Sequence, residues 1–132
     1  MEFTSDTVVD LEKDANEITG GISVDNFGID EMLKMQRELQ EQYKDIWESI
    51  SPETGKSKLL WMIGEIGEVI DIIKKNGDKA ADDPETRPHL TEELADVLMY
   101  YNDVLLCFGI TSDELKKAYA EKFHRNMSRW KK

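Results

Sequence analysis

The sequence LLWMIGEIGEVIDIIKK at positions 59–75 decides the fold class of this chain of 132 residues. Its aliphatic side chains recur at spacings of three and four, which places them on one face of a helix. They are Leu59, Met62, Ile63, Ile66, Val69, Ile70 and Ile73. Asn76-Gly77 follows as a stop signal, and Lys74-Lys75 suit the negative end of a helix dipole. We therefore predict an amphipathic helix over residues 55–75.

Three further segments have helical patterns, at residues 30–50, 88–108 and 111–129. Pro88 falls in a first turn, where a proline is tolerated, and Gly109 breaks the helix that Pro88 begins. The sequence TSDE from Thr111 has the form of a capping box. No alternating run of β-branched residues lies between turn signals, so we expect no sheet. The prediction is an all-α chain forming a four-helix bundle.

Residues 1–28 differ in composition from the rest of the chain. The first 31 residues hold nine Asp or Glu and one Lys, and much of the net charge of −11 lies there. We predict a flexible acidic arm over residues 1–28 and one domain over residues 29–132. Net acidity argues against a nucleic-acid duplex as partner, because contacts to phosphates need Lys and Arg.

Cysteine content and hydropathy predict the compartment. Cys107 is the only cysteine, so no internal disulfide can form, and a buried thiol suits a reducing compartment. No apolar run approaches the roughly 20 residues that a membrane span needs. The start of the sequence has no basic segment followed by an apolar one, as a secretory signal would. We expect a cytoplasmic protein without a membrane partner.

Two short acidic pairs carry the functional prediction. One predicted helix contains Glu65-Ile66-Gly67-Glu68 and the next contains Glu93-Leu94-Ala95-Asp96. Acids three residues apart project from neighbouring positions on one helix face. Apolar residues surround nearly the whole of the second of these helices, so we expect its acids to point into the bundle.

Local salt bridges cannot compensate these acids. Lys and Arg are absent between Lys58 and Lys74, and again between Arg87 and Lys116. Burying several like charges is costly unless something neutralises them, and a divalent cation would do so. Ligation by oxygen alone favours Mg²⁺, Mn²⁺ or Ca²⁺ over Zn²⁺, and Mg²⁺ shares its shell with phosphates. The alternative is that each pair is an ordinary solvated helix face, as a single ExxE usually is.

The two acidic pairs and their context resemble the all-α nucleoside triphosphate pyrophosphohydrolases of the MazG-like superfamily, which includes dimeric dUTPases and dCTP pyrophosphatases. The family signature is ExxE, a variable spacer and ExxD. Here 24 residues separate the two motifs, which lie within LLWMIGEIGEVIDIIKK and LTEELADVLMYY. The resemblance covers about residues 30–130. It implies a MazG-like helical bundle assembled as a homodimer or homotetramer.

The resemblance also implies an activity, the hydrolysis of a (deoxy)nucleoside triphosphate to the monophosphate and pyrophosphate, with nucleotide-pool house-cleaning as a role. One or two Mg²⁺ ions, replaceable by Mn²⁺, would be held by the catalytic carboxylates Glu65, Glu68, Glu93 and Asp96. A water activated by the metal and a carboxylate would attack the α–β linkage, with Glu65 or Glu68 orienting that water. The K…N..R pattern of the fourth helix would contact phosphates or the sugar through Lys122, Asn126 and Arg129.

For the residues beside the acids, the sequence allows two alternative roles each. Trp61 shares the face of Glu65 and Glu68, and either stacks on a base or packs in the core, as does Trp47. The hydroxyl of Tyr100 either bonds Asp96 or contacts a ligand. Asp103 either supports a metal ligand or is simply hydrogen-bonded to an N–H group. The alternative for the whole chain is a non-catalytic helical interaction module, or a metal- or nucleotide-binding regulatory module.

Overall fold

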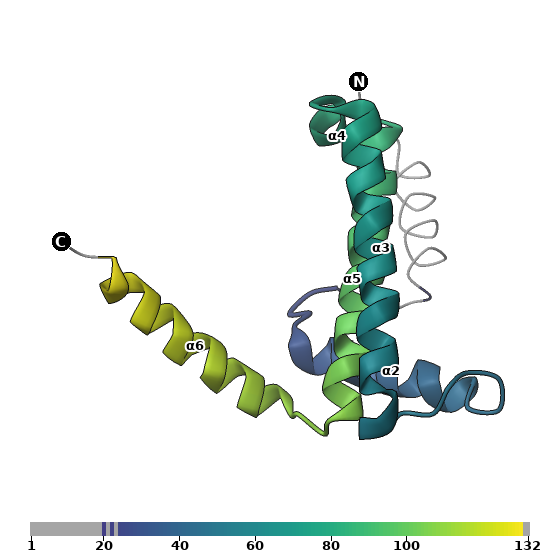
Figure 1. Ribbon diagram of the computed structural model, residues 1–132, viewed down its shortest axis with the longest axis vertical. Coiled ribbons are helices and arrows are strands. Elements are labelled where there is room, and N and C mark those ends of the chain that lie inside the picture. The colour runs from purple at the N-terminus through teal and green to yellow at the C-terminus, as the bar shows by residue number, and fades with distance from the viewer. Residues whose placement is uncertain (1–19, 21, 23, 131–132) are drawn as a thin grey trace, which may run out of the picture.

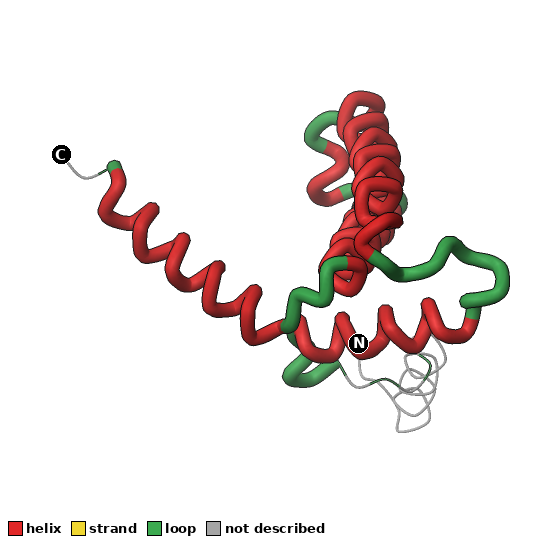
Figure 2. Tube along the Cα trace, turned by 60° about the horizontal axis from the view of Figure 1, so that its bottom comes forward, coloured by secondary structure: helices red, strands yellow, loops and turns green. Residues whose placement is uncertain are grey.

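The structure is a computed structural model that describes residues 20, 22 and 24–130 (Figure 1). Most of the predicted acidic arm, residues 1–28, therefore lies outside the described residues. The described elements are α2 (Ile29–Gln42), the 3-10 turn η1 (Pro52–Thr54), α3 (Gly55–Asn76), α4 (Lys79–Asp82), α5 (Thr86–Cys107) and α6 (Ser112–Arg129). They include no strand, which confirms the all-α class for this part of the chain (Figure 2).

Two long helices form the body of the molecule. α3 and α5 lie side by side as an antiparallel hairpin, and the short helix α4 closes its end (Figure 1). α2 crosses the opposite end of the hairpin, and α6 turns away from α5 with an angle of 111° between them. The four predicted helices therefore exist, but within one chain they do not close into a bundle, because α6 projects away from the hairpin.

Glycines and caps set the ends of these helices where the sequence predicted them. Gly77 follows α3 with a φ of 53°, a left-handed conformation that favours glycine. A Cβ on Gly55 would lie 2.5 Å from the ring of Phe108, so a side chain at this position would require that ring to move. The capping box is confirmed, since Thr111 N donates to Glu114 Oε2 over 3.0 Å and Glu114 N donates to Thr111 Oγ1 over 3.2 Å.

The expected extent of the first helix was wrong. α2 ends at Gln42 instead of continuing to residue 50. Beyond it, Trp47 N still donates to Tyr43 O over 2.8 Å, and the two rings stack with their centroids 4.7 Å apart. This single turn keeps the four-residue spacing of a helix without continuing one, so periodicity alone does not distinguish the two. Residues 78–87, which lie between two of the predicted helices, contain α4 and the start of α5, so helix is present where none was predicted.

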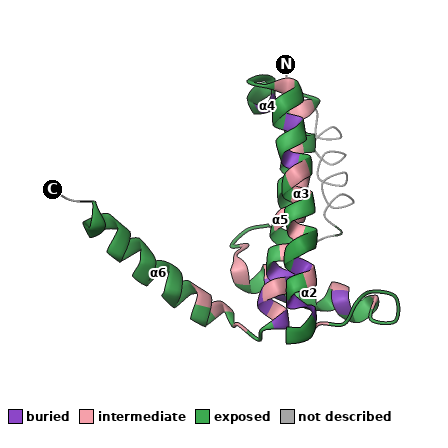
Figure 3. Cartoon of the chain, viewed as in Figure 1, coloured by how far each residue is buried: buried purple, intermediate pink, exposed green. Residues whose placement is uncertain are grey.

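One chain buries only a few of its residues (Figure 3) and leaves many large apolar side chains exposed. Among the described residues, the buried apolar side chains are Leu33, Val69, Ile72, Ala80, Leu105 and Cys107. Most of the aliphatic face predicted for α3 is exposed by 37–60%, as at Leu59, Ile63, Ile66, Ile70 and Ile73. α6 has no buried residue at all. These faces have the composition of a core but lack a covering element within the described chain.

Among the described residues, no single helix is both long and apolar enough to cross a bilayer, although α5 and α6 taken together across their bend meet that length and composition.

Candidate metal centre

The hairpin brings three of the four predicted carboxylates together. Glu65 lies on α3, whereas Glu93 and Asp96 lie on α5, and all three are half-buried. Each offers one carboxylate oxygen, and these three oxygens all lie within 4.8 Å of one another. The three-residue spacing on α5 and the side-by-side packing of α3 and α5 produce this convergence.

The fourth carboxylate, Glu68, is exposed beside the cluster and raises the pKa values of its members. The pKa of Glu93 is raised from 4.5 to about 7, first because its carboxyl group closely approaches that of Glu68 and then because of burial. The pKa of Glu65 is also raised, chiefly by burial and then by the charge of Glu68. The electrostatics therefore join all four acids in one site, with Glu68 itself exposed.

Two oxygens of the cluster are left without hydrogen bonds. Glu65 Oε2 and Glu93 Oε2 are buried and have no hydrogen-bond partner among the described residues. The ion pairs of the described chain, which involve Lys44, Lys116 and Lys117, all lie elsewhere. A buried acceptor without a partner is costly, and a bound cation would satisfy it. A set of carboxylate oxygens fits a hard divalent cation such as Mg²⁺.

A cavity of about 420 Å³ adjoins the cluster. It lies between α2, α3 and α5 and shares Asp96 with the acid cluster. Tyr100 lines this cavity, and its pKa is raised by burial and by Glu65. Trp61 lines it too and is 59% exposed in one chain. Trp47 also lines the cavity and is 39% exposed.

The polar residues that line this cavity include some that the sequence analysis did not predict as site residues. Asp103 Oδ1 accepts a hydrogen bond from Gln36 Nε2 over 2.8 Å and another from Gln40 Nε2 over 3.0 Å. The second reading of Asp103, as a hydrogen-bonded acid, is therefore confirmed. Lys58 is also buried here. The one available signal was the four-residue spacing of two glutamines within the apolar stripe of α2.

The predicted K…N..R residues lie elsewhere in the same chain. Lys122, Asn126 and Arg129 are all exposed on α6, which projects away from the hairpin that carries the acids (Figure 1). One chain therefore does not bring these three residues to the acid cluster.

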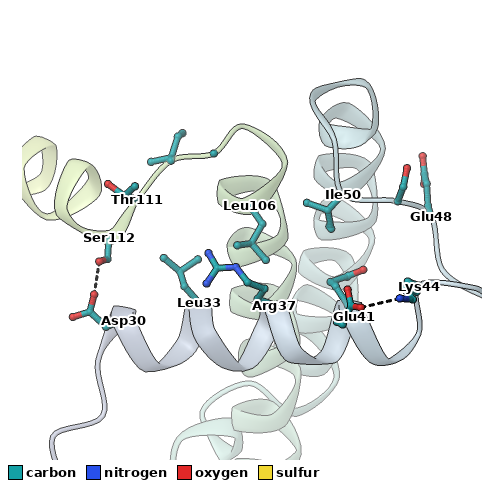
Figure 4. Close-up of a pocket in the computed structure, with 14 residues that line it drawn as sticks. Asp30, Leu33, Arg37, Glu41, Lys44, Glu48, Ile50, Leu106, Thr111 and Ser112 are labelled. Atoms are coloured by element: carbon teal, nitrogen blue, oxygen red, sulfur yellow. Dashed lines mark hydrogen bonds and ion pairs between the residues drawn. The ribbon is translucent and has the colours of Figure 1, made fainter.

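A second cavity, of about 580 Å³, lies between α2 and the turn that precedes α6. Figure 4 shows Asp30 and Ser112 at one end and Glu41 and Lys44 at the other, each pair joined by a hydrogen bond or an ion pair. The lining residues include Arg37 but none of the four acids, and this larger cavity shares Gln40 and Glu48 with the cavity beside the acid cluster.

Comparison with known families agrees with this geometry. Residues 53–129 match the family model of the MazG nucleotide pyrophosphohydrolase domain. No curated protein and no solved structure matches the chain. The match spans η1 to the end of α6 and so includes both acidic pairs and the K…N..R segment. The chain belongs to the MazG nucleotide pyrophosphohydrolase domain family.

Proposed function

We propose that this protein hydrolyses a nucleoside triphosphate between its α and β phosphates, giving the monophosphate and pyrophosphate. The proposal depends on one observation, the convergence of oxygens from Glu65, Glu93 and Asp96 with two buried carboxylate oxygens left without partners. Membership of the MazG family supports a nucleotide as the substrate. A nucleotide-pool house-cleaning role is consistent with this chemistry.

The carboxylates have different parts in this mechanism. Glu65, Glu93 and Asp96 hold Mg²⁺, which Mn²⁺ can replace, since their oxygens already converge. When bound, the cation lowers the pKa of water and neutralises charge on the phosphates. Glu68 lies at the exposed edge of the cluster, so it is the carboxylate best placed to orient a water and accept its proton.

The cavity beside the cluster holds the nucleoside. It is lined by Trp61, Trp47 and Tyr100, and its contact with the acids runs through Asp96. Exposed indole rings offer flat surfaces on which a base can stack. A triphosphate with its base in this cavity has its phosphates directed toward the acid cluster.

A second copy of the chain completes the site. The α6 helix and its C-cap residue Trp130 carry an exposed apolar stripe, with exposures of 60–77% at Tyr119, Phe123, Met127 and Trp130. The aliphatic face of α3 is also uncovered. The segment 116–132 holds seven basic residues and one acid, which complements the acid cluster. We therefore assign the active form to a homodimer or homotetramer. In this assembly α6 of one copy brings Lys122, Asn126 and Arg129 to the phosphates bound by another, where they stabilise developing charge.

The test is hydrolysis of a panel of ribo- and deoxynucleoside triphosphates, with Mg²⁺ and with EDTA, followed by identification of the products. We expect monophosphate and pyrophosphate in the presence of Mg²⁺ and no reaction in EDTA. Orthophosphate as the first product would overturn the proposed bond of cleavage. Nucleotide binding without any product would favour a regulatory module over an enzyme.

A further inference from the structure

Lys58 is a largely buried residue whose ammonium forms no ion pair with the described residues. Its residue is only 6% exposed, yet no carboxylate of the described chain lies within 4.0 Å of its ammonium. Its side chain also makes no hydrogen bond with any residue that the structure describes. The ammonium itself still opens onto the cavity that the residue lines, because Lys58 Nζ is not one of the enclosed atoms left without a hydrogen bond. A lysine whose ammonium faces a cavity and is not used in an ion pair can donate hydrogen bonds to a ligand there.

Asp103 faces the same cavity with one acceptor atom to spare. Its Oδ1 is held by Gln36 and Gln40, whereas its Oδ2 has no hydrogen bond within the described residues. Lys58 is close enough to lower the pKa of Asp103, but it forms no ion pair with it. The lining of one cavity therefore offers a donor, Lys58, and an acceptor, Asp103, that do not form an ion pair with each other.

We propose that Lys58 and Asp103 select the nucleobase, with Lys58 donating to a ring carbonyl oxygen and Asp103 Oδ2 accepting from the neighbouring ring N–H. This inference rests on the proposed function, because it places the base of the triphosphate in the cavity beside the acid cluster. It assigns Lys58 as a specificity-determining residue and Asp103 as its complement.

The pair favours bases that carry a lactam group, in which a carbonyl stands next to a ring N–H. Uracil, thymine, guanine and hypoxanthine have this arrangement, whereas cytosine and adenine carry an amino group beside an unprotonated ring nitrogen. An ammonium has only donors and an ionised carboxylate has only acceptors. A keto oxygen of guanine is a common partner of lysine in base recognition. Both hydrogen bonds in the lactam case are charge-assisted, which makes them the stronger type.

The experiment measures binding of nucleoside monophosphates by calorimetry without Mg²⁺, so that it does not depend on catalysis. We expect dUMP and dGMP to bind the wild-type protein about tenfold or more tightly than dCMP and dAMP, the ratio that one charged hydrogen bond supports. Lys58→Met should abolish this preference. Lys56→Met is the matched control, because Lys56 is exposed on the same helix, and it should leave the preference intact.

Two further measurements distinguish a ligand-binding lysine from a structural one. Lys58→Met should weaken dUMP binding while its thermal unfolding stays cooperative, which shows that the fold is retained. Asp103→Asn, whose amide group can donate, should weaken dUMP binding and spare dCMP. An unchanged base preference in Lys58→Met would overturn the inference even if triphosphates are cleaved. Selective binding of dUMP and dGMP without cleavage of any triphosphate would overturn the proposed function and leave this inference standing.

Discussion

Glu65 on α3 and Glu93 on α5 point oxygens toward each other within 4.8 Å, and each also has one buried oxygen without a hydrogen bond among the described residues. Two carboxylates at this distance repel each other unless one is protonated or a cation lies between them. In the metal-free protein, the raised pKa values of both groups favour protonation of one carboxylate. Binding of Mg²⁺ would instead place a cation between them.

The metal-free protein should lose stability as the pH rises from about 5 to above 7. Glu93 has an ordinary pKa of 4.5 in the unfolded chain and about 7 in the folded protein. Between these values the folded state binds the proton more tightly, so the free energy of unfolding falls with rising pH through this group. Thermal unfolding midpoints in EDTA at pH 5, 6, 7 and 8 measure the trend. Addition of Mg²⁺ at pH 8 should reverse the loss.

Glu93→Gln is the control for this assignment, because it removes the titrating group and keeps its size. In this variant the midpoint in EDTA should depend less on pH between 5 and 7, and Mg²⁺ should stabilise the protein less. A variant with the same pH slope as the wild type would show that other groups cause the trend.

Loss of a single ligand should abolish most of the activity. Glu93→Gln should lower kcat/KM by more than about 100-fold, because even groups that only support a metal ligand are worth about 10–100-fold. Glu92→Gln is the matched control, since Glu92 is the exposed neighbour of Glu93 on the same helix. Steady-state rates of pyrophosphate release measure both. Equal activity in the two variants would contradict a metal site at Glu93.

Helical periodicity predicted much of the fold, because the start and stop signals of α3, α5 and α6 are local. Gly77, Gly109 and the capping box at Thr111 act within one turn of chain, and the structure confirms them. The end of α2 was missed because the turn at Tyr43–Trp47 keeps a helical spacing. The direction of α6 depends on packing, which the pattern along one helix does not contain.

The candidate site was predictable to a similar extent. The acid pairs were found because their chemistry lies in short motifs and because no Lys or Arg neighbours them in sequence. Lys58 entered the sequence analysis only as the boundary of the segment that lacks Lys and Arg. Its burial could not be predicted, because it depends on α2 and α5, which are distant in sequence. The predicted roles of the residues on α6 and the cytoplasmic location stay predictions.

The apolar stripe of α6 should be an interface between copies of the chain. Phe123→Asp places a charge in the middle of this stripe and should shift the particle toward the 15.2 kDa monomer, with loss of activity. Ala118→Asp is the matched control, because it introduces the same charge about 140° away around the helix. Sedimentation measures the mass of each. A Phe123→Asp variant that keeps the wild-type mass and activity would exclude this face as the interface.

Subunit mixing should show whether α6 acts in the site of another copy. Glu93→Gln and Lys122→Ala chains are each expected to be nearly inactive as homo-oligomers. If Glu93 and Lys122 of one site come from different chains, a mixed dimer has one site with both residues intact and one site with neither. Equal co-refolded mixtures should then recover about a quarter of the wild-type activity, since half of the dimers are mixed and each has one working site.

Sites built within one chain would give no recovery at any mixing ratio, which would place Lys122 with its own acid cluster and contradict the shared site. Co-refolded Glu93→Gln and Asp96→Asn chains are the control, because both changes lie in the α5 helix of one cluster and no mixed dimer contains an intact set.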